Sequence, residues 1–153
     1  MKDNSGELRI EHITALASLD ACAHILVDAY NHEPWNDSWT HDMALEKLTC
    51  FFNSPKFLGW MAFQRGALCG CCVANIEPYY TCDYFYLKEM FVSPCVQGQG
   101  IGARLLEVIK RDLETLGIQQ IVLFTSNAGF PFNFYLNAGF SEMAGMRMMH
   151  FGE

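Results

Sequence analysis

The sequence lacks any long run of apolar residues, although 51% of its 153 residues are hydrophobic. A helix that crosses a membrane needs about 18 or more consecutive apolar residues, and the polar segment Met1 to Glu7 has no apolar stretch typical of a secretory signal peptide. We therefore expect a cytoplasmic protein with no membrane partner. The apolar half of the chain is enough for one ordinary core, so residues 1–153 are predicted to form a single domain.

Positive charge is also scarce in this chain. It has 10 lysines and arginines against 17 aspartates and glutamates, which gives a formal net charge of −7 at pH 7. Proteins that bind nucleic acid carry a basic patch, so this composition argues against a nucleic-acid partner. It weakly favours a cationic ligand.

The seven cysteines form no C-x-x-C pair, and no histidine stands at a zinc-ligand spacing from them. An odd number of cysteines in a cytoplasmic chain does not suggest a disulfide framework. We interpret them as reduced packing residues and predict no metal site.

Three closely spaced glycines, Gly98, Gly100 and Gly102, lie between a strand-like apolar run and a helical pattern. The first N–H groups of a helix have no partner within the helix, and the helix dipole adds about half a positive charge at that end. Glycines let an anion approach the main chain closely and accept positive φ angles. The segment is therefore predicted to bind an anion, most often a phosphate.

The common nucleotide motifs do not fit this loop. A dinucleotide-binding loop has the spacing G-x-G-x-x-G and an acidic residue about 20 positions later, whereas this chain has G-x-G-x-G followed by the uncharged residues 118–121. A P-loop ends in G-K-[ST], but Gly102 precedes Ala103 and Arg104. Both motifs are disfavoured.

The loop instead matches Q-x-x-G-x-G, and a second match, N…FY…GF, follows at Asn127, Phe134, Tyr135 and 139–140. From 84 to 140 the chain resembles the GNAT superfamily of acyl-CoA-dependent N-acetyltransferases, near its aminoglycoside N-acetyltransferase-like members. The resemblance implies acetyl-CoA as the cosubstrate. It assigns coenzyme binding to Phe91, Val92, Gln97, Gly98, Gln99, Gly100, Ile101, Gly102, Ala103, Asn127 and Phe134.

Periodicity predicts a mixed α/β domain, and the resemblance makes it a GNAT fold: a central mixed, mostly antiparallel sheet of about six or seven strands, flanked by about four helices. In that fold the strands 84–92 and 120–125 part to admit the pantetheine arm. The predicted strands are 8–13, 57–64, 67–76, 84–92 and 120–125, with a closing strand or strand pair at 141–151, and the predicted helices are 16–30, 40–52, 101–116 and 131–138. The last helix has a proline, Pro131, near its first turn. The helix 101–116 is expected to turn five residues inward: Ile101, Leu105, Ile109, Leu113 and Leu116.

Amine acetylation requires removal of a proton, because keeping an amine of pKa about 10.4 neutral at pH 7 costs roughly 4.6 kcal/mol. Glu89, a carboxylate in an apolar strand, is the candidate general base. Alternatively, it pairs with a neighbouring lysine or arginine or lies at a wet bulge. The resemblance makes Tyr135 the candidate acid for the coenzyme thiolate, with core packing as the alternative.

The acceptor is expected beside the loop between the first two helices, where Glu33 and Asp37 accompany Trp35, with help from Tyr80. Acids next to aromatics suit a cation with an apolar or sugar face, so a polyamine-like or aminoglycoside-like amine is the first hypothesis. A protein or peptide amine, or a non-catalytic acetyl-CoA-binding module, remains an alternative. A homodimer through the methionine-rich end of the chain is also open.

Overall fold

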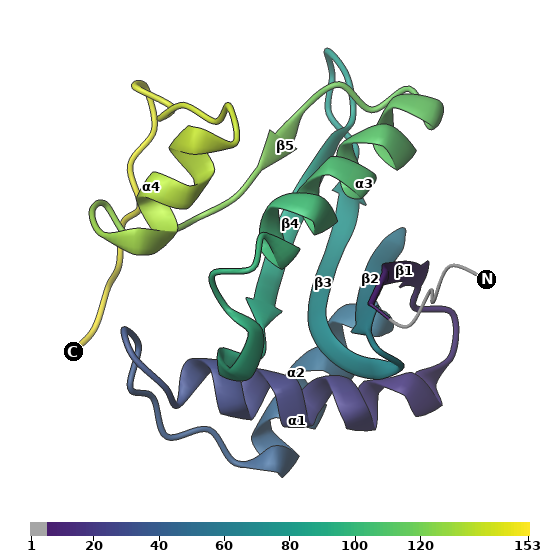
Figure 1. Cartoon of the computed structure of the whole chain (residues 1–153). Helices are drawn as coiled ribbons and strands as arrows, with labels where there is room; N and C mark the ends of the chain where they lie inside the picture. The colour runs from purple at the N-terminus through teal and green to yellow at the C-terminus, as the bar shows by residue number, and fades with distance from the viewer. Residues whose placement is uncertain (1–5) are drawn as a thin grey trace. The chain divides into compact units, whose positions relative to one another are not determined.

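The computed structural model describes residues 6–153, which divide into one unit that ends at Leu123 and a smaller unit, Phe124–Glu153, and each is described by itself. Figure 1 shows the elements along the chain. The first unit contains β1 (Leu8–His12), α1 (Leu19–Tyr30), α2 (His41–Phe52), β2 (Phe57–Gln64), β3 (Ala67–Glu77), β4 (Tyr84–Val92), α3 (Ile101–Thr115) and β5 (Ile121–Val122), with short 3-10 turns at Leu16–Ser18 and Pro94–Val96. The second contains α4 (Phe130–Asn137).

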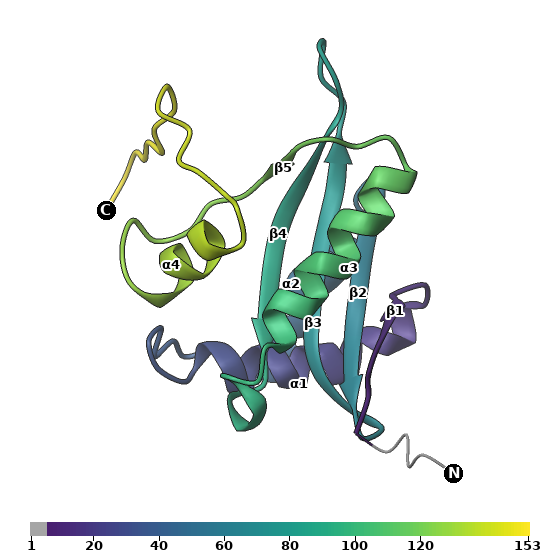
Figure 2. The same ribbon diagram turned by 45° about the horizontal axis from the view of Figure 1, so that its top comes forward.

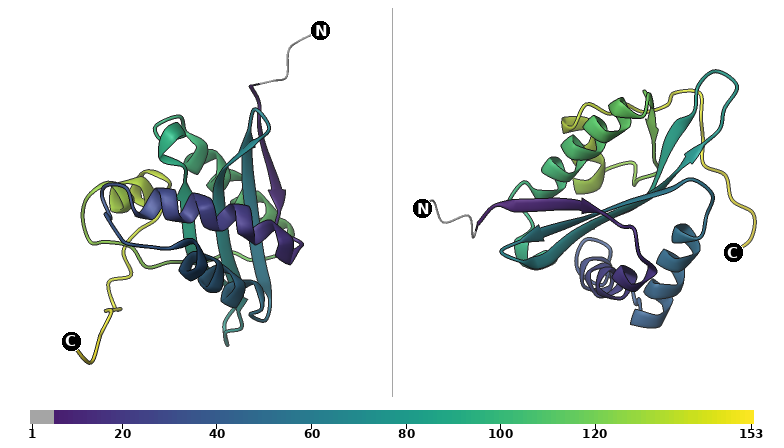
Figure 3. Two further views of the ribbon diagram at one scale, coloured as in Figure 1. Left: turned by 90° about the horizontal axis from the view of Figure 1, so that it is seen from below. Right: turned by 90° about the vertical axis from the view of Figure 1, so that its right-hand side faces the viewer.

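The sheet of the first unit has the order β1-β2-β3-β4-β5. Its first four strands are antiparallel neighbours, and β5 runs parallel to β4. Helices α1 and α2 cover one face and α3 crosses the other, as Figures 2 and 3 show. This arrangement confirms the predicted mixed, mostly antiparallel sheet with helices on both faces.

Each face of the sheet has its own apolar layer. Under α1 and α2, the fully buried Leu26 and Leu48 belong to a cluster that also contains Phe91 of β4. On the α3 face, Trp60 is buried, and its indole Nε1–H donates to Asp112 Oδ2 of α3 at 2.8 Å. The polar end of the largest core side chain is therefore satisfied by the helix that covers it.

The helix boundaries follow local chemistry. Helix α2 begins after Thr40, whose hydroxyl accepts the Met43 N–H at 3.2 Å as an N-cap. Helix α4 has Pro131 in its first turn, as expected. No helix in residues 6–153 has the length and apolar character needed to cross a membrane.

The sheet is smaller than the predicted six or seven strands, because five strands are found among residues 6–153. The strand expected at 120–125 is limited to Ile121–Val122, since only Phe85 and Tyr86 of β4 pair with it. No strand forms in the described segment 141–151, where a turn from Met143 to Met146, closed by an N–H···O bond of 3.0 Å, interrupts the run. The methionines there are exposed, and a homodimer through them stays a prediction.

Leu116 was expected on the buried face of α3, but it is 58% exposed, because the helix ends at Thr115 and Leu116 lies at its C-cap. The other predicted inward positions are buried: Ile101, Leu105, Ile109 and Leu113.

All seven cysteines are free thiols, and Cys22, Cys69, Cys71 and Cys72 are buried as packing residues. Burial is the main cause that raises the pKa of the Cys72 thiol, with Glu89 adding to it.

These positions on α3 give a stability prediction with a control on the same helix. Leu105→Ala should lower the free energy of unfolding by about 2–5 kcal/mol, because Leu105 is fully buried. Leu116→Ala should change it by no more than about 0.5 kcal/mol. Urea denaturation followed by circular dichroism measures both, and equal losses would contradict the two-faced packing of α3.

Candidate active site

An extra residue in β4 sets the geometry of the site. The Phe85 N–H donates to Gln120 O at 2.9 Å, toward β5, whereas the Ser93 N–H donates to Cys69 O at 2.7 Å, toward β3. In a regular strand, residues an even number apart point their N–H groups the same way. The reversal requires a β-bulge, and the register places it at Lys88, which has no opposite residue on β3.

The bulge turns Glu89 toward α1 and α2. Its Oε2 accepts the Tyr30 hydroxyl of α1 at 2.5 Å, and its Oε1 lies 3.1 Å from Lys47 Nζ of α2. The Glu89 side chain is only 17% exposed, and the Tyr30 ring lies 5.7 Å from the ring of Phe91. One carboxylate thus joins both helices to the central strand.

This environment matches what was expected if Glu89 were a paired carboxylate at a bulge. Lys47 is the partner that the sequence did not identify. Each carboxylate oxygen retains a further acceptor site, so proton transfer through a water is still open to Glu89. The catalytic role of Glu89 stays a prediction.

The glycine loop has the conformation that anion binding requires. Gly98 and Gly100 both have φ of +79°, and a Cβ at either position would meet no atom within 4 Å. Gly100 is the N-cap of α3 and offers no side-chain bond to the first turn, so the N–H groups of 101–103 are left for a ligand. Gln97 Nε2 donates to Val92 O at 3.0 Å and fastens the loop to the end of β4.

Strands β4 and β5 part after two paired positions, so along residues 87–92 of β4 that edge has no partner strand among the described residues. Since the Ser93 N–H points to β3, alternation points the Phe91 N–H the same way and the Val92 N–H toward the open edge. Of the two positions expected to hydrogen-bond the coenzyme, the geometry favours Val92 as the main-chain donor.

The loop 31–40 carries three of the expected acceptor residues, all exposed: Glu33, Trp35 and Asp37. Asp37 also has a structural role, because its Oδ2 accepts the Trp39 indole N–H at 3.0 Å. The Asn31 side chain closes the loop by bonding both the N–H and the C=O of Trp39, at 2.7 and 2.9 Å. The Trp35 ring lies 5.4 Å from that of Tyr30.

Tyr80 begins a row of four tyrosines that sequence reasoning recognised only in part. Successive ring centroids from Tyr80 through Tyr79 and Tyr84 to Tyr86 are 4.8, 6.0 and 6.4 Å apart. Because of the bulge, Tyr84 and Tyr86 share the sheet face of Glu89. The i, i+2 spacing puts Tyr84 and Tyr86 on one face of a strand, and it is the extra residue Lys88 that places this face on the side of Glu89.

Burial raises the pKa of Tyr86, with neighbouring Tyr84 and Glu77 adding to the effect. The phenol is therefore kept neutral to higher pH than an ordinary tyrosine, and Lys88 Nζ lies 3.3 Å from the centroid of its ring. Glu77 in turn accepts a hydrogen bond from Asn75 at 2.8 Å. The face beyond Glu89 is thus lined by aromatic rings next to the Glu77 carboxylate, with the Lys88 ammonium against the ring of Tyr86.

The second unit carries Asn127, Phe134 and Tyr135. Asn127 is exposed before α4, and Phe134 and Tyr135 are half-buried on that helix. The Tyr135 ring lies 5.1 Å from Phe134 and 5.3 Å from Phe140. Because this unit is described by itself, the roles of these residues toward the coenzyme and Glu89 stay predictions.

A sheet with an open edge beside a glycine-capped helix defines a class of coenzyme-binding transferases. Residues 55–142 match the family described as acetyltransferase (GNAT) domain, which is more than half of the chain. The chain belongs to this GNAT family. This confirms the predicted family, the enzyme class of acetyl-CoA-dependent N-acetyltransferase, and acetyl-CoA as cosubstrate.

Solved structures support the same fold. An aminoglycoside acetyltransferase, meta-AAC0020 from an uncultured soil metagenomic sample, in complex with sisomicin, has TM-score 0.72 at 16% identity, covering 95% of each chain. The aminoglycoside N-acetyltransferase AAC(6')-Iy, in complex with CoA, has TM-score 0.72 at 16% identity, covering 97% of this chain and 95% of that one. A possible acetyltransferase from Clostridium difficile 630 has TM-score 0.79 at 12% identity, and the match covers 95% of this chain and 97% of that one. No curated protein matches the sequence.

The glycine loop gives a binding prediction. Gly100→Ala should lower the affinity for acetyl-CoA, because alanine at φ +79° is strained by about 1–2 kcal/mol and shifts the N–H groups of the first turn. Gly117→Ala is the matched control, since Gly117 has φ +74° at the opposite end of α3. Calorimetric titration with acetyl-CoA measures both variants, and equal affinities would remove the loop from coenzyme binding.

Proposed function

We propose that this enzyme transfers the acetyl group of acetyl-CoA to a primary amine of a small cationic acceptor, polyamine-like or aminoglycoside-like, by direct attack in a ternary complex. The observation that carries the proposal is the position of Glu89, which lies at the bulge on the same sheet face as Tyr84 and Tyr86. A nearly buried carboxylate at one end of a row of aromatic rings suits an amine carried on an extended body.

The row of tyrosines supports a cationic acceptor. Tyr80 and Tyr79 are 88% and 56% exposed, so the outer end of the row is accessible to a ligand. Aromatic faces attract cations by about 0.5–2 kcal/mol each, and the net charge of −7 favours a cation further. Glu33 and Trp35 would extend the acceptor surface from the loop 31–40.

The coenzyme would be held at the open edge of β4. The N–H groups at the start of α3 and the loop residues Gln97, Gly98 and Gln99 would bind the pyrophosphate. The Val92 N–H would hydrogen-bond the pantetheine arm or the acetyl carbonyl, and Phe91 would pack beneath it. Asn127 and Phe134 are proposed as further coenzyme-binding residues.

The reaction removes two protons from the acceptor nitrogen and adds one to the leaving coenzyme thiolate. Glu89, acting through a water, would take a proton from the acceptor ammonium, and the neutral nitrogen would attack the thioester carbonyl carbon. The Val92 N–H would stabilise the negative charge on the carbonyl oxygen. The attacking nitrogen then loses its second proton to solvent. Collapse of the intermediate breaks the C–S bond, and Tyr135 would donate a proton to the coenzyme thiolate and regain one from water.

The structural relatives are consistent with an amine-rich sugar as acceptor. Two of them are aminoglycoside acetyltransferases, one of which was solved with sisomicin. Their identity of 16% supports a shared fold, so the acceptor is proposed from the residues of this chain.

A non-catalytic acetyl-CoA-binding module is the second candidate. It is favoured by one observation, that Tyr30 and Lys47 engage the two oxygens of Glu89. In such a module Glu89 would only fasten the two helices to the sheet.

Glu89→Gln and Tyr135→Phe should each lower kcat by about a hundred- to ten-thousandfold, because each removes a proton-transfer group. The KM for acetyl-CoA should stay within about twofold for Glu89→Gln, because Glu89 is proposed to move a proton and not to bind the coenzyme. Release of free coenzyme thiol measures the rate, and exposed Glu46 on α2 provides the control Glu46→Gln. A Glu89→Gln variant that loses stability but keeps kcat would make Glu89 purely structural.

The acceptor class is tested by a panel of polyamines, aminoglycosides and basic peptides in the same assay. We expect turnover with small polycations, weakened at least severalfold by Tyr84→Leu or Tyr86→Leu through a raised acceptor KM. Acetylation of peptides without any small amine would overturn the small-acceptor proposal. Absence of turnover with every acceptor, together with intact acetyl-CoA binding, would favour the non-catalytic module.

A further inference from the structure

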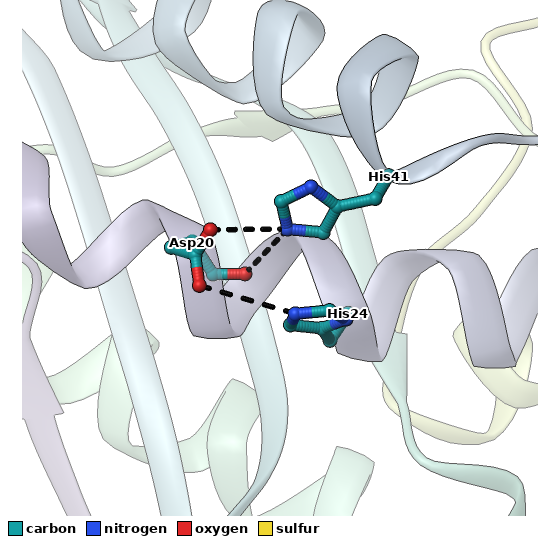
Figure 4. A group of neighbouring side chains, drawn as sticks. All are labelled: Asp20, His24 and His41. Atoms are coloured by element: carbon teal, nitrogen blue, oxygen red, sulfur yellow. Dashed lines mark hydrogen bonds and ion pairs between the residues drawn. The ribbon is translucent and has the colours of Figure 1, made fainter.

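A cluster of two histidines and one aspartate joins α1 to α2 away from Glu89. Asp20 and His24 stand one helical turn apart on α1, and His41 is the first residue of α2. Figure 4 shows one nitrogen of each imidazole ring directed at Asp20, and the His41 Nε2 also lies 3.3 Å from the Asp20 main-chain oxygen. One ligand atom from each of the three residues can be chosen so that all lie within 4.8 Å of one another.

We propose that Asp20, His24 and His41 bind one divalent transition metal ion, with Zn²⁺ as the best fit. Imidazole nitrogens and a carboxylate oxygen are common zinc ligands, and three protein ligands with a water in the fourth position make a complete tetrahedral site. Mg²⁺ and Ca²⁺ prefer all-oxygen ligands and fit two imidazoles poorly.

The separations of the ligand atoms match such a site. Tetrahedral bonds of about 2.0–2.1 Å place the ligand atoms about 3.3–3.4 Å from one another. His41 Nε2 lies 3.2 Å from Asp20 Oδ1, and His24 Nε2 lies 3.9 Å from Asp20 Oδ2. The two imidazole centroids are 4.2 Å apart. The two histidines approach different oxygens of Asp20, so the carboxylate must turn to present one oxygen to an ion shared by both rings.

The surroundings also support a metal. The Asp42 carboxylate lies 3.9 Å from His41 Nδ1, the ring nitrogen opposite the one directed at Asp20. That separation is beyond a hydrogen bond and the Asp42 side chain is fully exposed, so its negative charge favours a cation nearby without fixing the ring. The side chains of Asp20 and His24 are 66% and 65% exposed, so an ion and its water can enter from solvent.

A bound ion would link the start of α2 to α1. His41 directly follows the loop 31–40, so the ion would anchor the end of that loop as well as the helix packing. Helices α1 and α2 also carry Tyr30 and Lys47, the partners of Glu89. The metal would stabilise this framework without contacting Glu89, and the inference does not depend on which amine is acetylated.

The test uses tag-free, full-length protein freed of metal by a chelator. Titration with ZnCl₂ at pH 7.5 in a calorimeter should show one bound ion, and excess Zn²⁺ should raise the Tm because it binds the folded state. His24→Ala and His41→Ala should abolish this binding and the Tm rise. His150→Ala, an exposed histidine outside the cluster, is the control and should bind as wild type.

A measurement without substitutions guards against variants that misfold. In NMR spectra, Zn²⁺ should shift the imidazole nitrogen signals of only two of the five histidines, His24 and His41. The proposal is overturned if wild-type protein binds no Zn²⁺ at millimolar concentration, if His24→Ala binds it unchanged, or if the shifted signals belong to other histidines.

Discussion

The single extra residue at Lys88 is the constraint on which the site depends. Without it, Glu89 and Phe91 would face α3, and Glu89 could not accept hydrogen bonds from Tyr30 or pair with Lys47. A bulge leaves one residue without a partner on the neighbouring strand, disrupts the hydrogen bonds locally and increases the twist of the strand. Here it directs a carboxylate between two helices and lies within the stretch 87–92, where β4 has no partner strand on its outer edge among the described residues.

The sequence predicted the parts of the fold that depend on local chemistry. Glycines with positive φ, helix periodicity and a proline in a first turn act within a few residues, so Gly98, Gly100 and Pro131 could be interpreted from the sequence alone. The inner face of α3 was predicted correctly up to its last residue. Leu116 was assigned wrongly because periodicity does not specify where a helix stops.

Features that depend on distant residues could not be predicted. A bulge adds no distinctive residue type, so the sequence offered a bulge at Glu89 only as an alternative and could not place it at Lys88. Lys47 and Glu89 are 42 positions apart, and the sequence indicated only that Glu89 would need some partner. Asp20 and His24 have helical spacing, but nothing in the sequence brings His41 to them. The short β5 likewise reflects the parting of two strands, which no local propensity encodes.

The closure of the loop 31–40 by Asn31 has an evolutionary consequence. Its two hydrogen bonds to Trp39 hold the ends of the loop together independently of the residues between them. Positions 32–36 can therefore accumulate substitutions while α1, α2 and the carboxylate beneath them keep their places. A scaffold with this property can acquire new acceptors by drift in a short exposed segment, with its coenzyme-binding half unchanged.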